Sequence, residues 1–221
     1  WSSDVCSSDL DKYEYAGASG GYLDFLGYPF CRGRILGNIE KSDKYNTTRE
    51  IFWASGSCFI IRKSIFKLLN GFDEDFFCHM EEIDLCWRLK NLDSSYKIIT
   101  IGKANVYHVG GGTMQYGGNR KNYLNFRNSL VMLIKNLPKK YFIFSLFLRL
   151  ICDLFILIFS VLLFRFGLSF SILSAYYFNI LNFRKSLSKR KKGLGSYKYF
   201  ICFSILINYY FFGKKTFSSI K

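Results

Sequence analysis

The chain has 221 residues, of which 50% are hydrophobic, and a formal net charge of +15 at neutral pH. This length allows one domain of roughly 100 to 200 residues plus an appendage, and the apolar content is sufficient for a buried core. The seven cysteines contain no Cys-x-x-Cys pair, which argues against a zinc finger. Their odd number and scattered positions indicate free thiols in a reducing compartment, with Cys58, Cys78 and Cys86 as small core residues.

The positive charge is unevenly distributed along the chain. Residues 1–134 contain 16 Lys or Arg and 15 Asp or Glu, whereas residues 135–221 contain 15 Lys or Arg and one acid, Asp153. The two parts therefore need separate explanations. We expect a non-native or disordered leader over residues 1–10, a folded domain over residues 11–137 and a helical tail over residues 138–221. The leader is polar and lacks the basic start and the apolar run of a signal peptide.

Glycines and one proline punctuate residues 11–50, which predicts an irregular loop laid over a sheet. Arg32 and Arg34 lie in this segment. They are either ordinary surface residues, which we favour for each arginine taken singly, or contacts to an acceptor or a phosphate.

Residues 51–61 are expected to begin and end as a strand. Gly56 lies in its middle, and a glycine inside a strand often marks the close approach of a ligand or another backbone. The apolar run at residues 59–61 is typical of a buried strand. A short helix over residues 62–69 should follow and end at Asn70-Gly71.

The remaining elements before the tail are two strands and one helix. The apolar, β-branched residues 97–101 and residues 104–108 predict strands. Residues 119–137 predict an amphipathic helix that ends before Pro138.

Between these elements, residues 80–90 predict a helix that begins with three crowded carboxylates. Glu81 and Glu82 fall in its first turn, where the helix dipole favours negative charge. Asp84 and Arg88 are one turn apart, in the favourable order for an ion pair. These effects do not explain the crowding of Glu81, Glu82 and Asp84, because mutual repulsion is costly unless a cation or a proton comes to the site.

The tail combines apolar helices with basic residues. Residues 141–183 are mostly apolar, but Arg149, Asp153 and Arg165 interrupt them, so we expect no clean membrane-spanning segment. A basic run follows at residues 184–192. This pattern favours a segment that lies in the interface of an anionic cytoplasmic leaflet.

Three alternatives for the tail stay open. These alternatives are a soluble helical hairpin that caps the domain, a shallow re-entrant hairpin and a nucleic-acid-binding segment. The apolar density around the basic run argues against nucleic acid, and the scarcity of acids argues against a simple soluble cap.

Four ordered segments of the chain resemble motifs of the family 2 glycosyltransferases, which have the GT-A fold. These are residues 52–58, the acidic segment 71–88, residues 106–113 and residues 123–129. The resemblance is greatest to the rhamnosyltransferase-like branch of bacteria and covers residues 11–137. It implies an α/β fold, specifically the acceptor-side, C-terminal part of a GT-A domain followed by an apolar, basic helical tail.

The resemblance also implies roles for the acids and for the loop that follows. Glu82 occupies the position of the general base, with Glu for the usual Asp, while Glu81 and Asp84 orient the acceptor or the helix; Asp84 as the base is the alternative. His108 is expected to bind a divalent metal, Mg or Mn, or to contact the donor diphosphate. Gly110, Gly111 and Gly112 would let backbone NH groups approach phosphate.

Further substrate-binding candidates lie beside these motifs. They are Trp53, Ser55, Gly56, His79, Trp87 and Arg88. Trp53 and Trp87 would stack on a sugar ring or, equally, belong to the core. His79 would bind acceptor hydroxyls or form a local hydrogen bond.

The resemblance predicts an inverting glycosyltransferase that moves a sugar, rhamnose by likeness alone, from a nucleotide-sugar donor to a lipid-linked or polysaccharide acceptor. It would act in cell-surface glycan synthesis, at the cytoplasmic face of the bacterial inner membrane as a peripheral or monotopic protein. The sequence shows no Gly-rich strand–helix start and no Asp-x-Asp motif between apolar strands. We therefore expect a fragment without the nucleotide-binding half, with only part of the metal site, inactive alone and poorly folded. The alternative is a non-enzymatic module that binds the membrane surface.

Overall fold

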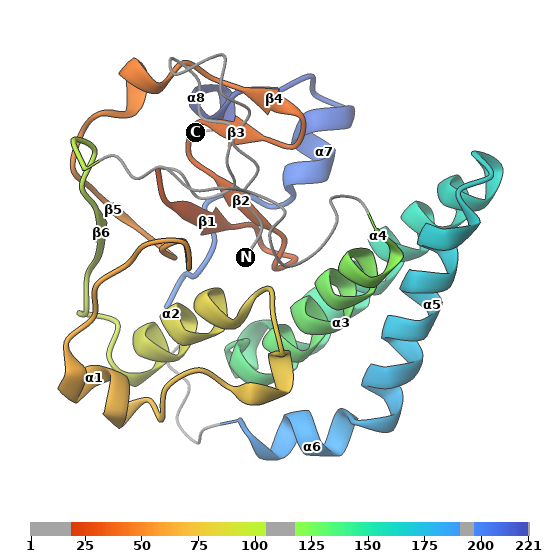
Figure 1. Cartoon of the computed structure of the whole chain (residues 1–221). Helices are drawn as coiled ribbons and strands as arrows, with labels where there is room; N and C mark the ends of the chain where they lie inside the picture. Colours follow the sequence, from red (N-terminus) through yellow and green to blue (C-terminus); the bar gives the residue numbers. More distant parts are fainter. Residues whose placement is uncertain (1–18, 105–117, 191–196, 221) are drawn as a thin grey trace.

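The structure is a computed structural model that describes residues 19–104, 118–190 and 197–220. These residues form an α/β fold, as the sequence predicted. Figure 1 shows two small sheets on one side of the molecule and the helices α2 and α3 beneath them, with α4, α5 and α6 along the outer edge. The strands are β1 (Gly21–Leu23), β2 (Pro29–Cys31), β3 (Arg34–Ile35), β4 (Asn38–Ile39), β5 (Arg49–Ile51) and β6 (Ile98–Thr100). The first helix is α1 (Lys63–Leu68). The other helices are α2 (Glu81–Leu92), α3 (Asn119–Asn136), α4 (Phe142–Leu162), α5 (Phe166–Leu181), α6 (Phe183–Ser188), α7 (Ile205–Tyr210) and α8 (Phe217–Ile220), with short 3-10 turns η1 (Ser42–Tyr45), η2 (Glu74–Phe76) and η3 (Lys139–Tyr141).

The first sheet is an antiparallel meander in the order β1-β2-β3-β4. The expectation of an irregular loop was therefore wrong for this segment. Gly27 and Gly33 have φ values of +75° and +91°, which the tight connections before and after β2 require. Gly27 also lies against α3, since a Cβ atom there would be 2.2 Å from the side chain of Leu133.

The second sheet pairs β5 with β6, and Ile51 lies opposite Ile98. The strand predicted at residues 97–101 is thus confirmed. The strand predicted at residues 51–61 is wrong beyond Ile51, where β5 ends. Ile60 is 99% exposed, so the apolar run 59–61 is not a buried strand. After a turn at Gly56 the chain leaves the sheet, and no neighbouring strand covers this run among the described residues.

The three helices predicted before the tail are confirmed as α1, α2 and α3. Asn70 and Gly71 end α1 with φ values of +57° and +64°, the left-handed conformation expected of a helix stop. Only Ala104 of the strand predicted at residues 104–108 lies within the described residues.

The main core joins α2, α3 and the tail. Trp87 of α2 is fully buried, with its ring 5.8 Å from that of Phe52 and 4.9 Å from that of Tyr199. Leu133 and Leu137 belong to the same cluster. Residues after Pro138 therefore pack directly against the helix that begins with the carboxylates.

One helix among the described residues is long and apolar enough to cross a membrane by length and composition, contrary to the sequence prediction. It runs over Lys139–Leu162, with a mean hydropathy of 2.5. The two charges that interrupt its sequence are buried: Arg149 Nε is 2.9 Å from Asp153 Oδ2, and the side chains are 2% and 0% exposed. Because the pair faces the protein, the outward surface of α4 is apolar.

The partners of this ion pair come from the rest of the fold. Arg149 donates to the hydroxyl of Ser129 (2.7 Å) and to the carbonyl of Leu26. Asp153 accepts hydrogen bonds from the hydroxyls of Tyr28 and Tyr176. These two charges, which argued against a membrane-spanning segment in the sequence, instead attach α4 to α3, α5 and the first sheet.

We predict that Asp153→Asn destabilises the protein by about 3–5 kcal/mol, because it leaves Arg149 buried without its counter-charge. Urea unfolding in detergent, followed by tryptophan fluorescence, measures this loss. Arg165→Gln is the control, since it removes an exposed charge next to α4. Equal free energies of unfolding for the two variants would contradict the assigned role of the pair.

Candidate functional site

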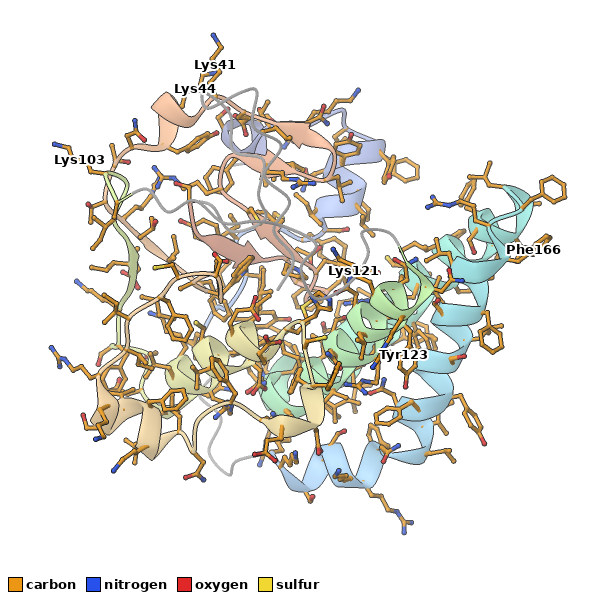
Figure 2. All side chains as sticks on the ribbon, viewed as in Figure 1. Lys41, Lys44, Lys103, Lys121, Tyr123 and Phe166 are labelled. Carbon is orange, nitrogen blue, oxygen red and sulfur yellow. The ribbon has the colours of Figure 1, made fainter. Side chains whose placement is uncertain are left out.

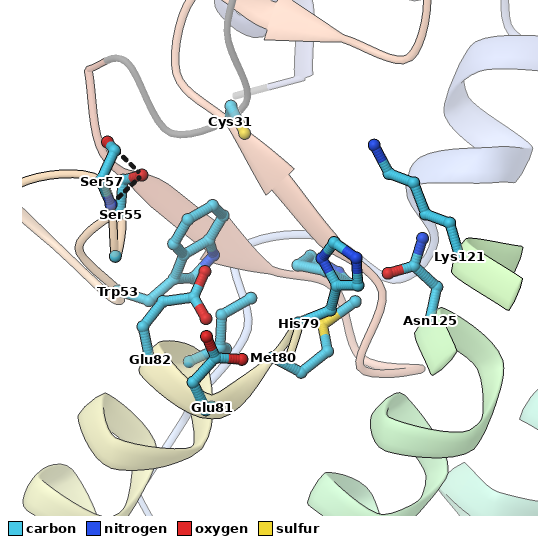
Figure 3. Close-up of a pocket in the computed structure, with 13 residues that line it drawn as sticks. Cys31, Trp53, Ser55, Ser57, His79, Met80, Glu81, Glu82, Lys121 and Asn125 are labelled. Atoms are coloured by element: carbon cyan, nitrogen blue, oxygen red, sulfur yellow. Dashed lines mark hydrogen bonds between the residues drawn. The ribbon is translucent and has the colours of Figure 1, made fainter. Parts of the chain in front are cut away.

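A cavity of about 210 Å³ lies where the two sheets meet the first turns of α2 and α3. Figure 3 shows its walls: Lys121 and Asn125 of α3 on one side, and Glu82, Trp53 and Ser55 on the other. The lining residues are Pro29, Cys31, Trp53, Ser55, Gly56, Ser57, His79, Met80, Glu81, Glu82, Ile83, Lys121 and Asn125. Six residues predicted from the sequence are among them: Trp53, Ser55, Gly56, His79, Glu81 and Glu82.

Glu81 and Glu82 point into this cavity from the first turn of α2. The Oε2 atom of each is buried and has no hydrogen-bond partner among the described residues. Burial raises the pKa of Glu82 to about 7, the negative charge of Glu81 adds to the rise, and backbone NH groups of α2 oppose it. Burial also raises the pKa of Glu81. A carboxyl group with a pKa near 7 can accept a proton from a bound ligand at neutral pH.

Asp84, the third crowded acid, does not face the cavity. Its side chain is 0% exposed, and it accepts hydrogen bonds from Arg88 Nε at 2.7 Å and Asn136 Nδ2 at 2.8 Å. Lys135 Nζ lies 2.9 Å from Oδ1. Because these donors occupy both oxygens, Asp84 is a structural residue, and the geometry removes it as the alternative base.

Arg88 is also structural rather than substrate-binding. Besides the predicted ion pair with Asp84, it donates to the carbonyls of Leu69 and Gly71. These contacts fix the end of α1 against α2. These contacts engage each of the three guanidinium nitrogens, and Arg88 does not line the cavity.

The two tryptophans occupy different environments. Trp87 is fully buried in the core, so stacking on a sugar is wrong for this residue. Trp53 lines the cavity, and its indole Nε1 donates to the carbonyl of Tyr22 at 3.0 Å. A Cβ atom at Gly21 would lie 1.9 Å from the Trp53 ring, so only glycine permits this placement of the ring.

The loop after β5 contributes two hydroxyls to the cavity. Ser55 Oγ lies 2.9 Å from Ser57 Oγ, and both residues line the cavity together with Gly56. Small side chains leave room here for a polar ligand.

His79 lies next to Asn125 at the cavity. Its Nε2 is buried without a hydrogen-bond partner among the described residues. Burial lowers the pKa of His79 to about 4, and the charge of Lys121 acts in the same direction. The imidazole is therefore neutral at pH 7 and can exchange hydrogen bonds with hydroxyl groups.

The predicted metal and phosphate loop cannot be placed. His108, Gly110, Gly111 and Gly112 lie outside the described residues. Within the described ranges no group of three or more His, Cys, Asp or Glu side chains could hold a metal ion. The described side chains alone thus do not form the predicted metal site, and the metal stays a prediction.

The arginines of the first sheet lie elsewhere. Arg32 is 3% exposed and donates to Thr47 Oγ1 at 2.7 Å, so it is neither a surface residue nor a cavity residue. Arg34 Nε donates to the nearby carbonyl of Leu36. Both arginines stabilise turns of the chain.

Lys121 and Asn125 line the cavity but were not predicted from the sequence. They lie one turn apart on α3, and Lys121 is only 9% exposed. Asn128, on the same face three residues later, is fully buried. Polar residues on the buried stripe of an amphipathic helix were the available signal, because burial of a polar group needs a partner or a ligand.

Comparison with known proteins finds local similarity to two rhamnosyltransferases. The chain is 38% identical over 60 residues to an N-acetylglucosaminyl-diphospho-decaprenol L-rhamnosyltransferase of Mycobacterium tuberculosis, a match that covers 27% of this chain and 19% of the relative. It is 43% identical over 66 residues to rhamnosyltransferase WbbL of Escherichia coli K12, covering 30% of this chain and 24% of the relative. No family model and no solved structure matches the chain.

The matches thus span about a fifth to a quarter of the relatives' length. Such partial matches support a glycosyltransferase role in general.

Proposed function

We propose that the cavity is the acceptor site of an inverting glycosyltransferase with the acceptor half of a GT-A fold, and that Glu82 is its general base. The observation that carries this proposal is the position of Glu82, a carboxylate without a described hydrogen-bond partner at Oε2, inside a cavity. The nearby acid Asp84 on the same helix is bound by three donors, whereas the carboxylate of Glu82 can take up a proton.

The proposed reaction is a direct displacement at the anomeric carbon. The acceptor hydroxyl gives its proton to the Glu82 carboxylate while its oxygen attacks the anomeric carbon of the donor sugar. The bond from that carbon to the diphosphate oxygen breaks, and the nucleoside diphosphate leaves with the electron pair. Because attack and departure occur on opposite faces, the anomeric configuration inverts.

The other cavity residues hold the acceptor for this step. Ser55 and neutral His79 offer hydrogen bonds to sugar hydroxyls, and the Trp53 ring forms an apolar wall. A divalent cation, bound in part by His108, would neutralise charge on the leaving diphosphate. The nucleotide-binding half, the fragment character of the chain and rhamnose as the sugar stay predictions.

A second part of the proposal concerns the membrane. Most of α4 and α5 presents large apolar side chains to the outside, including Phe155 and Phe159, which are 58% and 60% exposed. Figure 2 shows Phe166 at the outer end of this helix pair, away from the rest of the fold. An apolar patch of this kind marks a membrane or protein interface, and the 15 basic residues after residue 134 favour an anionic bilayer.

We infer that this surface binds the cytoplasmic leaflet and brings the cavity to a lipid-linked acceptor. The name of the mycobacterial relative describes a lipid-linked acceptor, decaprenol diphosphate with an attached sugar. The same surface supports the alternative function, a membrane-binding module without catalysis, and sugar transfer distinguishes the two.

We predict that Glu82→Gln lowers the rate of sugar transfer by about 100-fold or more, because a positioned general base contributes roughly that factor. The assay uses the chain joined to a nucleotide-binding half, with donor binding measured in parallel and expected to be unchanged. Glu74→Gln, at an exposed acid of η2, is the matched control. Full turnover in Glu82→Gln would remove Glu82 as the base.

We also predict how the transfer rate in this assay depends on pH. Since the pKa of Glu82 is raised to about 7, its carboxylate becomes populated as the pH rises through that value. The transfer rate should therefore increase from about pH 6 to about pH 8. A flat profile over this range would show that another group accepts the proton.

For the membrane surface, we predict that Phe155→Glu with Phe159→Glu weakens binding to vesicles containing phosphatidylglycerol by more than about 10-fold, because each buried aromatic side chain contributes about 2 kcal/mol. Vesicle flotation of the whole chain measures the bound fraction. Ile60→Glu, at a fully exposed residue outside α4, is the control. Unchanged binding of the double variant would refute this surface.

A further inference from the structure

The loop that leads into α2 is held in an unfavourable backbone conformation. Phe77, His79 and Met80 have φ values of +63°, +70° and +72°. Non-glycine residues rarely adopt this region, and such a conformation persists only when the surrounding structure imposes it. Met80 is the N-cap residue of α2 and forms no side-chain capping bond, so the direction of the first turn depends on this loop.

Asn128 of α3 supplies the contacts that impose the conformation. Its Nδ2 lies 2.9 Å from the carbonyl oxygen of Phe76, 2.7 Å from that of Cys78 and 2.8 Å from that of His79. The side chain is fully buried. One amide group thus binds three carbonyls of the loop, directly before the carboxylates of the cavity.

Arg127 fixes the orientation of that amide. Its Nε donates to Asn128 Oδ1 at 2.7 Å, which leaves Nδ2 directed at the loop. Its Nη2 donates to the carbonyls of Asp75 and Phe76. Arg127 and Asn128 belong to the segment 123–129 that the resemblance singled out without a role.

We propose that Asn128 is a positioning residue for Glu82. By binding the carbonyls of residues 76, 78 and 79 it holds the left-handed loop, so that α2 begins with the carboxylate of Glu82 inside the cavity. Without the amide, the carbonyls of Cys78 and His79 lose this donor and the loop relaxes toward ordinary φ values, which turns the first turn of α2 toward solvent. This inference rests on the proposed function, because it concerns the same carboxylate.

The test is a titration of Glu82 that needs no donor and no acceptor. Carboxyl carbons of ¹³C-labelled glutamate are followed by NMR in the full chain, and the Glu82 signal is the one that disappears in Glu82→Gln. In Asn128→Ala the pKa of Glu82 should fall from about 7 to about 6 or lower, because the group moves toward water. The other ionisable side chains around the cavity, Glu81, His79, Lys121 and Cys31, are the same in every sample.

The matched control is Asn179→Ala. Asn179 is a buried asparagine of α5 whose Nδ2 binds the carbonyls of Ala175 and Arg127 and none of the loop carbonyls that Asn128 binds. A merely structural role predicts that both variants lose stability in urea and that Glu82 titrates alike in both. That result would overturn the proposal.

Two further outcomes are informative. If Asn128→Ala does not fold, Asn128→Leu, which keeps the volume of the side chain but has no donor, replaces it, and an unchanged pKa of Glu82 there would count against the proposal. A fall in the pKa in the Asn128 variant together with full transfer by Glu82→Gln would confirm positioning and refute the base. The two proposals therefore fail independently.

Discussion

The structure depends on the polar contact between α3 and the start of α2. At one end Asn128 binds three carbonyls of the loop before α2. At the other end, two turns along α3, Lys135 and Asn136 bind the buried carboxylate of Asp84. A buried charge is costly unless it is paired and hydrogen-bonded, so α2 has one favourable position on α3. This position places its first turn at the cavity.

Two acids on one helix therefore have different properties. Asp84 has three donors and is a structural group, whereas among the described residues Glu82 has only the backbone of its own helix and a like charge beside it. The environment of each carboxyl group, rather than its residue type, makes Asp84 a structural ion-pair partner and Glu82 the proposed proton acceptor.

The apolar surface and the cavity are parts of one packed unit. Arg149 of α4 donates to Ser129, which directly follows Asn128 on α3. The ion pair that makes the outside of α4 apolar thus also attaches this helix to the one that positions Glu82. In the proposed function, this connection holds the acceptor site at a constant distance from the bilayer.

The sequence alone was sufficient to predict the helices α1, α2 and α3 and the ion pair between Asp84 and Arg88, because helix stops and pairs one turn apart depend on neighbouring residues. It could not decide between Glu82 and Asp84, or between Trp53 and Trp87. Asp84 is neutralised by residues of α3, and Trp87 is covered by Tyr199 from the tail. The exposure of Ile60 and the inward direction of Arg149 were likewise decided by tertiary structure. Burial and charge pairing depend on residues that are distant in the chain, and no local pattern contains them.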